Sequence, residues 1–452
     1  MEPPRRSCAR SQPRPRKRRV DRSVLLVALL ASLSSAQAAT REPAAAAAPG
    51  EAARFAPRSA PPAAGPEAAV GVLLPLSGRY RTFGESCLRG IRVALGALEN
   101  RTPVVRTVIL DSLGDPSQAA SAYQKLAGDP GIVAVLGPML GAEIDAVQTY
   151  AHGFGMPTLT FAQRAVGVGG PLFRFSLTKE DQAAVLARYA VVERGLRRWA
   201  IFYPDDGYGR EIAGSFREAV EALGGRVVAD VGYPPGKSDL QAEAKRLQSR
   251  IGVVENQPPP LDGVFLPESA ERLAMVTSYL GFVDIRGVQL LGASGWDRPQ
   301  GLLGAMPAVE GGVFVDGFFL YSFRPEVRAF VDAFRDAYHG DPGTLEAYGF
   351  DAAALVRDVI AAGSTSRPAV LEQLRRPSLR RGATGETVIA AGGRIEKGLF
   401  LLEVEEGTVR EIDAAAPAIS GEPAPPPRPA AAEDRPPRPE GGVRSTEDRL
   451  GE

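Results

Sequence analysis

The sequence predicts an α/β protein with two lobes, each a mostly parallel sheet flanked by helices. Short apolar runs alternate with helix-period segments between residues 69 and 404, in two successive series. The first apolar run, AVGVLL at 69–74, is almost uninterrupted, which is typical of a parallel strand covered on both faces. With 452 residues, 44% of them hydrophobic, the chain is long enough to bury two cores.

The first series of elements opens at 69–74 and alternates in order. Strands are expected at 69–74, 104–110, 132–136 and 158–160. Helices are expected at 85–98, where Leu88, Ile91, Leu95 and Leu98 recur at helical spacing, after Asp115-Pro116, and at 142–152. Asp115 has the chemistry of an N-cap, because its carboxylate can accept from the first free backbone N–H groups of the helix.

The second series opens with a strand at 173–177, followed by Thr178 and Asp181 at capping-box spacing. Further strands are expected at 199–203, 227–231, 263–266, 288–291 and 312–319, with a short β-rich end at 386–404. Helices are expected at 182–192, 210–223, 240–249, 271–280, 326–338 and 345–361. Ligands of such folds bind beyond the carboxyl ends of parallel strands.

The two ends of the chain differ from this middle region. Residues 1–38 combine nine Lys or Arg residues, an apolar run at 24–33 and Ala36-Gln37-Ala38, which predicts a secretory signal peptide. A retained membrane anchor is the alternative, although the ten-residue run is shorter than the roughly 20 residues that span a bilayer. Residues 39–67 and 413–452 are Pro-rich and aperiodic, so we expect a disordered linker and a disordered tail.

Charge and cysteine content limit the possible partners. Signal-peptide removal leaves 44 basic and 51 acidic residues, an acidic balance that argues against a nucleic-acid partner. We expect no stable membrane insertion of the processed protein. It would keep only Cys87, so an intrachain disulfide is excluded.

Catalytic and metal-binding motifs do not assemble. His152 and His339 are far apart and lack a set of neighbouring ligands. Gly236-Lys237-Ser238 lacks the earlier glycine of a phosphate loop, and the S-x-x-K spacing from Ser176 to Lys179 lacks its partner motifs. We therefore expect neither an enzyme nor a cofactor or metal.

The loop after the first strand is the first candidate for a binding site. Ser77 offers a hydroxyl and nearby backbone N–H groups ahead of a helix, which suits a polar or anionic group. An ordinary helix-entry turn is the alternative. Phe83 is expected in the same loop, either covering a ligand or as a core ring.

Several motifs, in their order, resemble the leucine/isoleucine/valine-binding family of periplasmic solute receptors. The opening VLLPLSGRYRTFGESCLRG at 72–90 also resembles the receptor-like domain of penicillin-binding protein activators. The further matches are Gly137-Pro138, Met156–Thr160, Phe173–Phe175 before Gln182, Asp206–Gly209, Ala347–Ala353, Gly382–Glu386 and the segment from Lys397. The resemblance covers roughly residues 69–411.

This resemblance implies the type I periplasmic-binding fold, with two lobes joined by a three-segment hinge and a ligand trapped by hinge closure. Lobe 1 is then expected at 68–174 and 316–380, and lobe 2 at 175–315 and 381–412. The family's ligand positions fall on Ser77, Phe83, Gly141, Ala142, Thr160, Tyr208, Glu268 and Ser294.

Some of these positions depart from the amino-acid-binding pattern. Gly141 stands where a serine hydroxyl usually meets the ligand carboxylate, and Ser294 where an acid usually pairs with the ligand ammonium. Glu268 would restore the negative charge from the neighbouring loop, or would be a solvated acid at a helix start. Trp296 is expected to add an apolar or stacking wall.

The resemblance leaves two functions open. The first is an extracytoplasmic solute-binding protein that captures a small polar, amino-acid-like ligand in the periplasm for an inner-membrane ABC permease. The second is a regulatory module that contacts a penicillin-binding protein, with its tails as tethers. A ligand-binding cleft distinguishes the first from the second.

Overall fold

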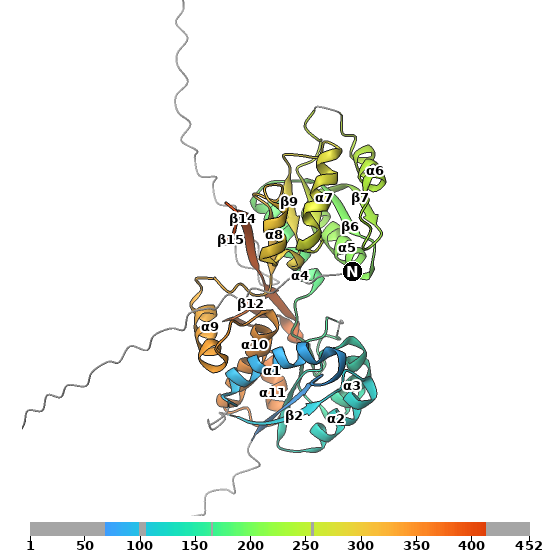
Figure 1. The fold of residues 1–452 in the computed structure, drawn as a ribbon. Helices are drawn as coiled ribbons and strands as arrows, with labels where there is room; N and C mark the ends of the chain where they lie inside the picture. Colours follow the sequence, from blue (N-terminus) through green and yellow to red (C-terminus); the bar gives the residue numbers. More distant parts are fainter. Residues whose placement is uncertain (1–67, 99–104, 164–165, 255–256, 413–452) are drawn as a thin grey trace, which may run out of the picture. The chain divides into compact units, whose positions relative to one another are not determined.

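The computed structural model describes residues 68–98, 105–163, 166–254 and 257–412, and the predicted signal peptide, linker and tail lie outside these ranges. Within them the protein is a two-lobed α/β fold with one large sheet in each lobe (Figure 1). No helix in the described residues is both long and apolar enough to span a membrane.

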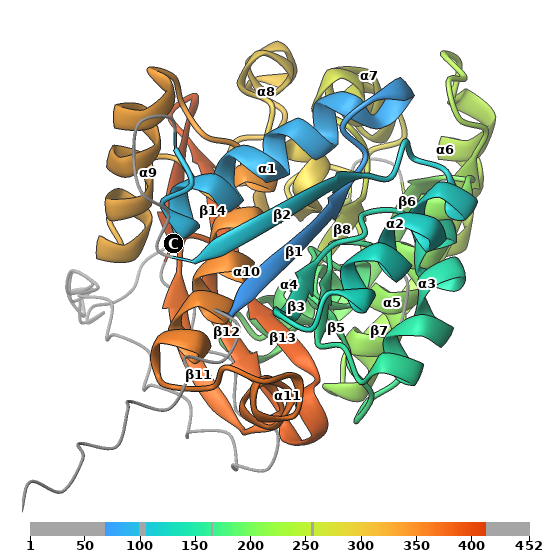
Figure 2. The same ribbon diagram turned by 90° about the horizontal axis from the view of Figure 1, so that it is seen from below.

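The sheet of the first lobe has five strands in the order β2-β1-β3-β4-β5, and all its pairs are parallel. The strands are β1 Ala69–Leu74, β2 Arg106–Asp111, β3 Ile132–Leu136, β4 Thr158–Thr160 and β5 Leu172–Arg174. Its helices are α1 Arg81–Leu95, α2 Pro116–Gly128, α3 Gly141–Phe154, α10 Thr344–Ala361 and α11 Arg367–Arg375. Figure 2 shows α2 and α3 on one face and α1, α10 and α11 on the other.

The sheet of the second lobe has seven strands in the order β15-β14-β10-β9-β8-β6-β7. They are β6 Arg198–Pro204, β7 Arg226–Tyr233, β8 Gly263–Leu266, β9 Gln289–Gly292, β10 Val313–Asp316, β14 Phe400–Glu405 and β15 Thr408–Ile412. The neighbouring helices are α4 Lys179–Ala187, α5 Gly207–Ala222, α6 Gln241–Ile251, α7 Ala270–Phe282 and α8 Pro299–Ala305, whereas α9 Pro325–Tyr338 contacts α1 of the first lobe. Strands β14 and β15 pair antiparallel, whereas β6 to β10 are parallel.

A small antiparallel sheet lies where the chain returns to the second lobe. Its strands are β11 Ser378–Gly382, β12 Gly385–Ile389 and β13 Ile395–Gly398. The chain passes between the two large sheets three times, after β5, after β10 and after β13. These three segments are the physical basis of a hinge, whereas the exact lobe boundaries stay a prediction.

The helix caps predicted from the sequence are confirmed. Asp115 accepts from the backbone N–H groups of Ser117 and Gln118 at 3.0 Å, and Thr178 accepts from that of Asp181 at 3.0 Å. Both caps satisfy N–H groups that the first helical turn leaves free. Local chemistry therefore positions the starts of α2 and α4.

Several element boundaries differ from the sequence expectation. The expected strand at 312–319 ends at Asp316, whose carboxylate accepts from the next backbone N–H and turns the chain. The expected helix at 182–192 changes from α4 to a π-helical turn at Arg188–Glu193. Helix α11 was not expected, although its Pro368 lies in the first turn, where proline is tolerated.

Candidate functional site

The carboxyl end of the first sheet contains Ser77, three residues after β1 ends. The partly buried Asp111 of β2 receives the backbone N–H groups of Leu76 and Leu113, each at 2.8 Å. Burial disfavours the charge of Asp111, but a hydrogen bond from the Ser77 side chain and these backbone bonds outweigh it and lower its pKa. The Ser77 hydroxyl therefore already donates a hydrogen bond to Asp111, and a ligand would compete with Asp111 for this donor.

Thr160 and Phe83 occupy different kinds of position. Thr160 is fully buried at the end of β4, and its hydroxyl donates to the carbonyl oxygen of Pro138 at 2.8 Å while accepting from Ala162 at 3.1 Å. Phe83 is not in a loop as expected, because α1 already begins at Arg81. Its ring is 53% exposed, so it is no core residue and stays available as a cover.

The carboxyl end of the second sheet brings Tyr208 and Ser294 together. Tyr208 is the second residue of α5 and is 38% exposed, whereas Ser294 follows β9. Burial of the phenol raises the pKa of Tyr208 to about 12, against the effect of its hydrogen bond with the Ser294 side chain. The backbone N–H of Ser294 donates at 3.0 Å to Oε1 of Gln182, which ties α4 to this edge.

Two predicted ligand residues point into the second lobe instead. Trp296 is fully buried, with 0% of its surface exposed. Its indole N–H donates to the carbonyl oxygen of Leu266 at 3.0 Å. Its ring packs beside Phe314, with ring centroids 6.1 Å apart. The expectation that Trp296 forms a ligand wall is therefore corrected, because its indole fills the core of the lobe and its only hydrogen-bond donor is satisfied there.

Glu268 is also committed to the protein. Its carboxylate accepts from the Tyr233 hydroxyl at 2.7 Å, the Ser269 backbone N–H at 2.8 Å and Arg272 Nε at 3.1 Å. It is 7% exposed, so it is not the solvated acid that was the alternative. Because its buried carboxylate accepts from three donors, Glu268 has a structural role and holds the start of α7 in place.

A cleft of about 440 Å³ connects residues of both lobes. Gly141 and Ala142, at the N-terminus of α3, form part of its lining, and Lys179 and Glu211 from α4 and α5 form another part. The remaining lining residues are Asp145, Gln163, Arg174 and Glu180. The cleft therefore includes two of the predicted ligand residues, and Glu211 lies one helical turn beyond Tyr208.

Lys179 is the functional candidate that sequence reasoning missed. Its ammonium lies 2.9 Å from Glu211 Oε2 and donates to Gln163 Oε1 at 3.3 Å, and it stands 5.8 Å from the centroid of the Tyr208 ring. Its side chain is 17% exposed, so its charge lies within the cleft wall. The S-x-x-K spacing did single out this lysine, but only as a catalytic motif.

A pair of carboxyl groups lies near Tyr208 at the end of β10. Burial and the nearby charge of Asp297 raise the pKa of Asp316 to about 8. Burial also raises the pKa of Asp297, whose side chain is hydrogen-bonded to Asp316. The charge of Asp316 further raises the pKa of Tyr208. Asp316 is therefore mostly protonated at neutral pH, and a negative charge on this edge would come from Asp297, because Ser294 is neutral.

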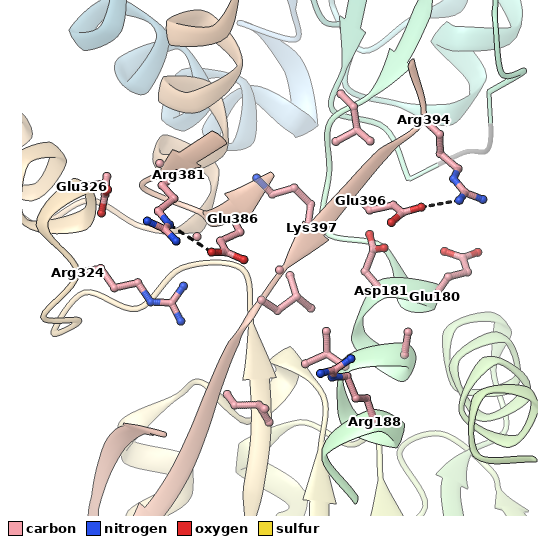
Figure 3. Close-up of a pocket in the computed structure, with 18 of the residues that line it drawn as sticks. Glu180, Asp181, Arg188, Arg324, Glu326, Arg381, Glu386, Arg394, Glu396 and Lys397 are labelled. Carbon is pink, nitrogen blue, oxygen red and sulfur yellow. Dashed lines mark hydrogen bonds and ion pairs between the residues drawn. The ribbon is translucent and has the colours of Figure 1, made fainter. Parts of the chain in front are cut away.

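A second cavity, of about 840 Å³, lies beside the small sheet (Figure 3). Ala184, Val185 and Leu401 give it apolar walls, and many charged side chains surround it. Arg381 pairs with Glu386 at 3.2 Å, and Arg394 pairs with Glu396. This cavity contains none of the predicted ligand residues.

Comparison with known proteins gives one family. The profile described as periplasmic binding protein matches residues 67–408. Leu/Ile/Val-binding protein BraC3 of Rhizobium johnstonii is 28% identical over 197 residues, 42% of this chain and 53% of BraC3. Leu/Ile/Val-binding protein homolog 2 of Brucella abortus is 26% identical over 347 residues, covering 72% of this chain and 86% of the relative.

Solved structures agree with the family match. An ABC transporter substrate-binding protein from Sphaerobacter thermophilus has a TM-score of 0.63 and 26% identity, over 78% of this chain and 98% of that chain. The chain spans about half the length of BraC3 and of Leu/Ile/Val-binding protein homolog 3 of Brucella melitensis. Since the family profile matches most of its length, the chain belongs to the periplasmic binding protein family, whose members bind solutes and are not enzymes.

Proposed function

We propose that this protein captures a small, carboxylate-bearing organic solute between its two lobes in the periplasm and delivers it to an inner-membrane ABC permease. The observation that carries the proposal is the 440 Å³ cleft at the carboxyl ends of the parallel strands. Its volume lies in the range of ordinary small-molecule sites, and it combines a helix N-terminus with a half-buried cation.

The part of the cleft at Gly141 and Lys179 suits an anionic group on the ligand, although the acids Asp145, Glu180 and Glu211 also line the cleft. Gly141 has no hydroxyl, but its backbone begins α3, and Lys179 contributes a positive charge to the same cleft. Glu211, with its side chain 66% exposed, now pairs with Lys179. A ligand carboxylate would replace this exposed partner, and exchange of one exposed ion pair for another costs little free energy.

The names of the relatives support an amino-acid-like ligand, because BraC3 and the Brucella homologue are named for leucine, isoleucine and valine. A neutral Ser294 weakens the usual contact with an ammonium group. Asp297, hydrogen-bonded to the protonated Asp316, is the described acid that would attract one on this edge. The site residues of the proposal are therefore Ser77, Gly141, Ala142, Thr160, Tyr208 and Ser294, together with Lys179 and the acid pair.

Isothermal titration calorimetry of the purified chain tests this proposal. The panel pairs each amino acid with its deaminated carboxylate and its decarboxylated amine, for example leucine with 4-methylpentanoate and isopentylamine. We expect binding of the carboxylates and a loss of at least tenfold in affinity in Lys179→Met, with no change in the exposed control Lys125→Met. Heats of dilution alone across the panel would refute solute capture and favour the module that contacts a penicillin-binding protein.

A further inference from the structure

One buried side chain, Lys397 of β13, contacts the first of the three segments that connect the lobes, and it contacts the second through the ring of Tyr348. Lys397 is 3% exposed, and its ammonium donates to the hydroxyls of Thr384 and Thr387. Figure 3 shows it beside the larger cavity, between the residues labelled on β12 and those on α4. A lysine ammonium in such a place is rare unless its charge has a function or several partners.

The ring contacts of Lys397 reach the first connecting segment and helix α10. The ammonium lies 4.6 Å from the centroid of the Phe175 ring, and Phe175 follows β5 directly. It also lies 5.3 Å from the centroid of the Tyr348 ring of α10. Both rings present π-electron density to the cation, which is worth more away from water than at the surface.

Tyr348 in turn reaches the second connecting segment. Its hydroxyl is buried without a hydrogen-bond partner among the described residues. It lies next to Gly317, the residue after β10, because a Cβ atom added to Gly317 would stand 2.7 Å from that hydroxyl. The second segment therefore packs closely on the same ring that contacts Lys397.

The charges that face Lys397 compensate its burial only in part. Asp351 of α10 receives the backbone N–H groups of Ala383 and Thr384 at 2.8 and 2.7 Å, and Asp181 contributes from α4. Burial lowers the pKa of Lys397 to about 8, against these two carboxylates. On its cavity side the neighbouring pairs are Arg381 with Glu386 and Arg394 with Glu396.

We propose that Lys397 is a positioning residue for ligand capture, whose ammonium holds the three connecting segments in one arrangement and so sets the separation of the two lobes. The proposal rests on the proposed function only in that lobe closure is what captures the solute. No ligand contact is required of Lys397, since the 440 Å³ cleft does not include it. Loss of the proton, or of the side-chain nitrogen, would release the segments from each other.

Double electron–electron resonance measures this separation without a ligand. In a chain that also carries Cys8→Ser, nitroxides on Ser121→Cys and Glu218→Cys would label exposed positions of α2 and α5, one in each lobe, while the native Cys87 is buried. In the otherwise native chain we expect the distance distribution to change between pH 6.5 and 9.5 with a midpoint near 8. Lys397→Met should show the high-pH distribution throughout, and Lys125→Met should behave like the native chain.

A second variant covers the case in which Lys397→Met does not fold. Thr387→Val preserves side-chain shape and removes one acceptor of the ammonium, so the midpoint should fall by about one pH unit. A pH response that persists in Lys397→Met, or an unchanged midpoint in Thr387→Val, would overturn the proposal and point to Asp316, which titrates in the same range. Absence of any bound solute would affect only the proposed function, because the distances are measured without one.

Discussion

Replacement of Glu268 by glutamine separates a structural role of this acid from a ligand-binding role. In the structure its buried carboxylate receives Tyr233, Ser269 and Arg272, and hydrogen bonds to a charged group contribute about 1.5–3 kcal/mol each. Glutamine keeps one acceptor oxygen and turns an NH₂ group toward the remaining donors. Because the Arg272 side chain is 25% exposed and its bond is partly screened, we expect a net loss of about 2–3 kcal/mol.

Urea unfolding followed by tryptophan fluorescence measures this loss. Both tryptophans of the chain, Trp199 and Trp296, are buried in the second lobe together with Glu268, so their emission reports on the lobe that is perturbed. The midpoint should fall by about 1 M with an unchanged slope. The matched control is Glu271→Gln, an exposed acid in the first turn of α7, which should change the midpoint little.

A result in the opposite direction would refute this reasoning. If Glu268→Gln unfolds like the native chain but loses affinity for amine-bearing solutes, the carboxylate is a ligand group and its internal partners are incidental. If stability falls while the affinity for the tightest-binding solute stays within twofold, the structural assignment holds.

Three further predictions follow from buried groups. Trp296→Ala should destabilise the second lobe by about 3–5 kcal/mol in the same urea assay, because a fully buried indole leaves a cavity; a cost below 1 kcal/mol would contradict the packing described. The pKa of Asp316 is raised to about 8 from about 4 in the unfolded chain, so its folded form stays protonated between these values and its contribution to stability falls as pH rises from 4 to 8, by up to about 1.4 kcal/mol per pH unit. Asp316→Asn should flatten that slope, and an identical slope in the variant would assign it to other groups. Burial and the charge of Glu346 raise the pKa of the Cys87 thiol, so a disulfide reagent should label it only after unfolding, and rapid labelling of the folded chain would show that the contact of α1 with α10 opens.

Most of the fold could be predicted from local sequence patterns. The uninterrupted apolar run of β1 predicted a strand covered on both faces, and α1, α10, α2 and α3 do cover it. Caps at Asp115 and Thr178 were predictable because a side chain and the backbone two or three residues ahead suffice to form them. The end of β10 was not predictable in this way, because the apolar pattern continues through Phe318 and Phe319 after the chain has turned.

The candidate site was predictable only in part, since it depends on contacts between distant segments. Tyr208 and Ser294 are 86 residues apart in the sequence and meet because β6 and β9 belong to one sheet. Sequence position suggested that Trp296 faces a ligand, yet its indole fills the core. Lys179 gave only a misleading catalytic spacing, and the cleft that gives it a role is formed by α3 and α5.

The sequence by itself determined the alternation of strands and helices, the starts of α2 and α4 and the family, because these depend on periodicity, on short-range hydrogen bonds and on motif order. Tertiary structure alone decided which polar side chains are buried and what they face. Lys397 is the clearest case: its neighbours come from segments that begin more than two hundred residues apart, and only their packing removes its ammonium from water and places it among Phe175, Tyr348 and Thr387. Desolvation and long-range charge depend on that packing, and no local pattern encodes them.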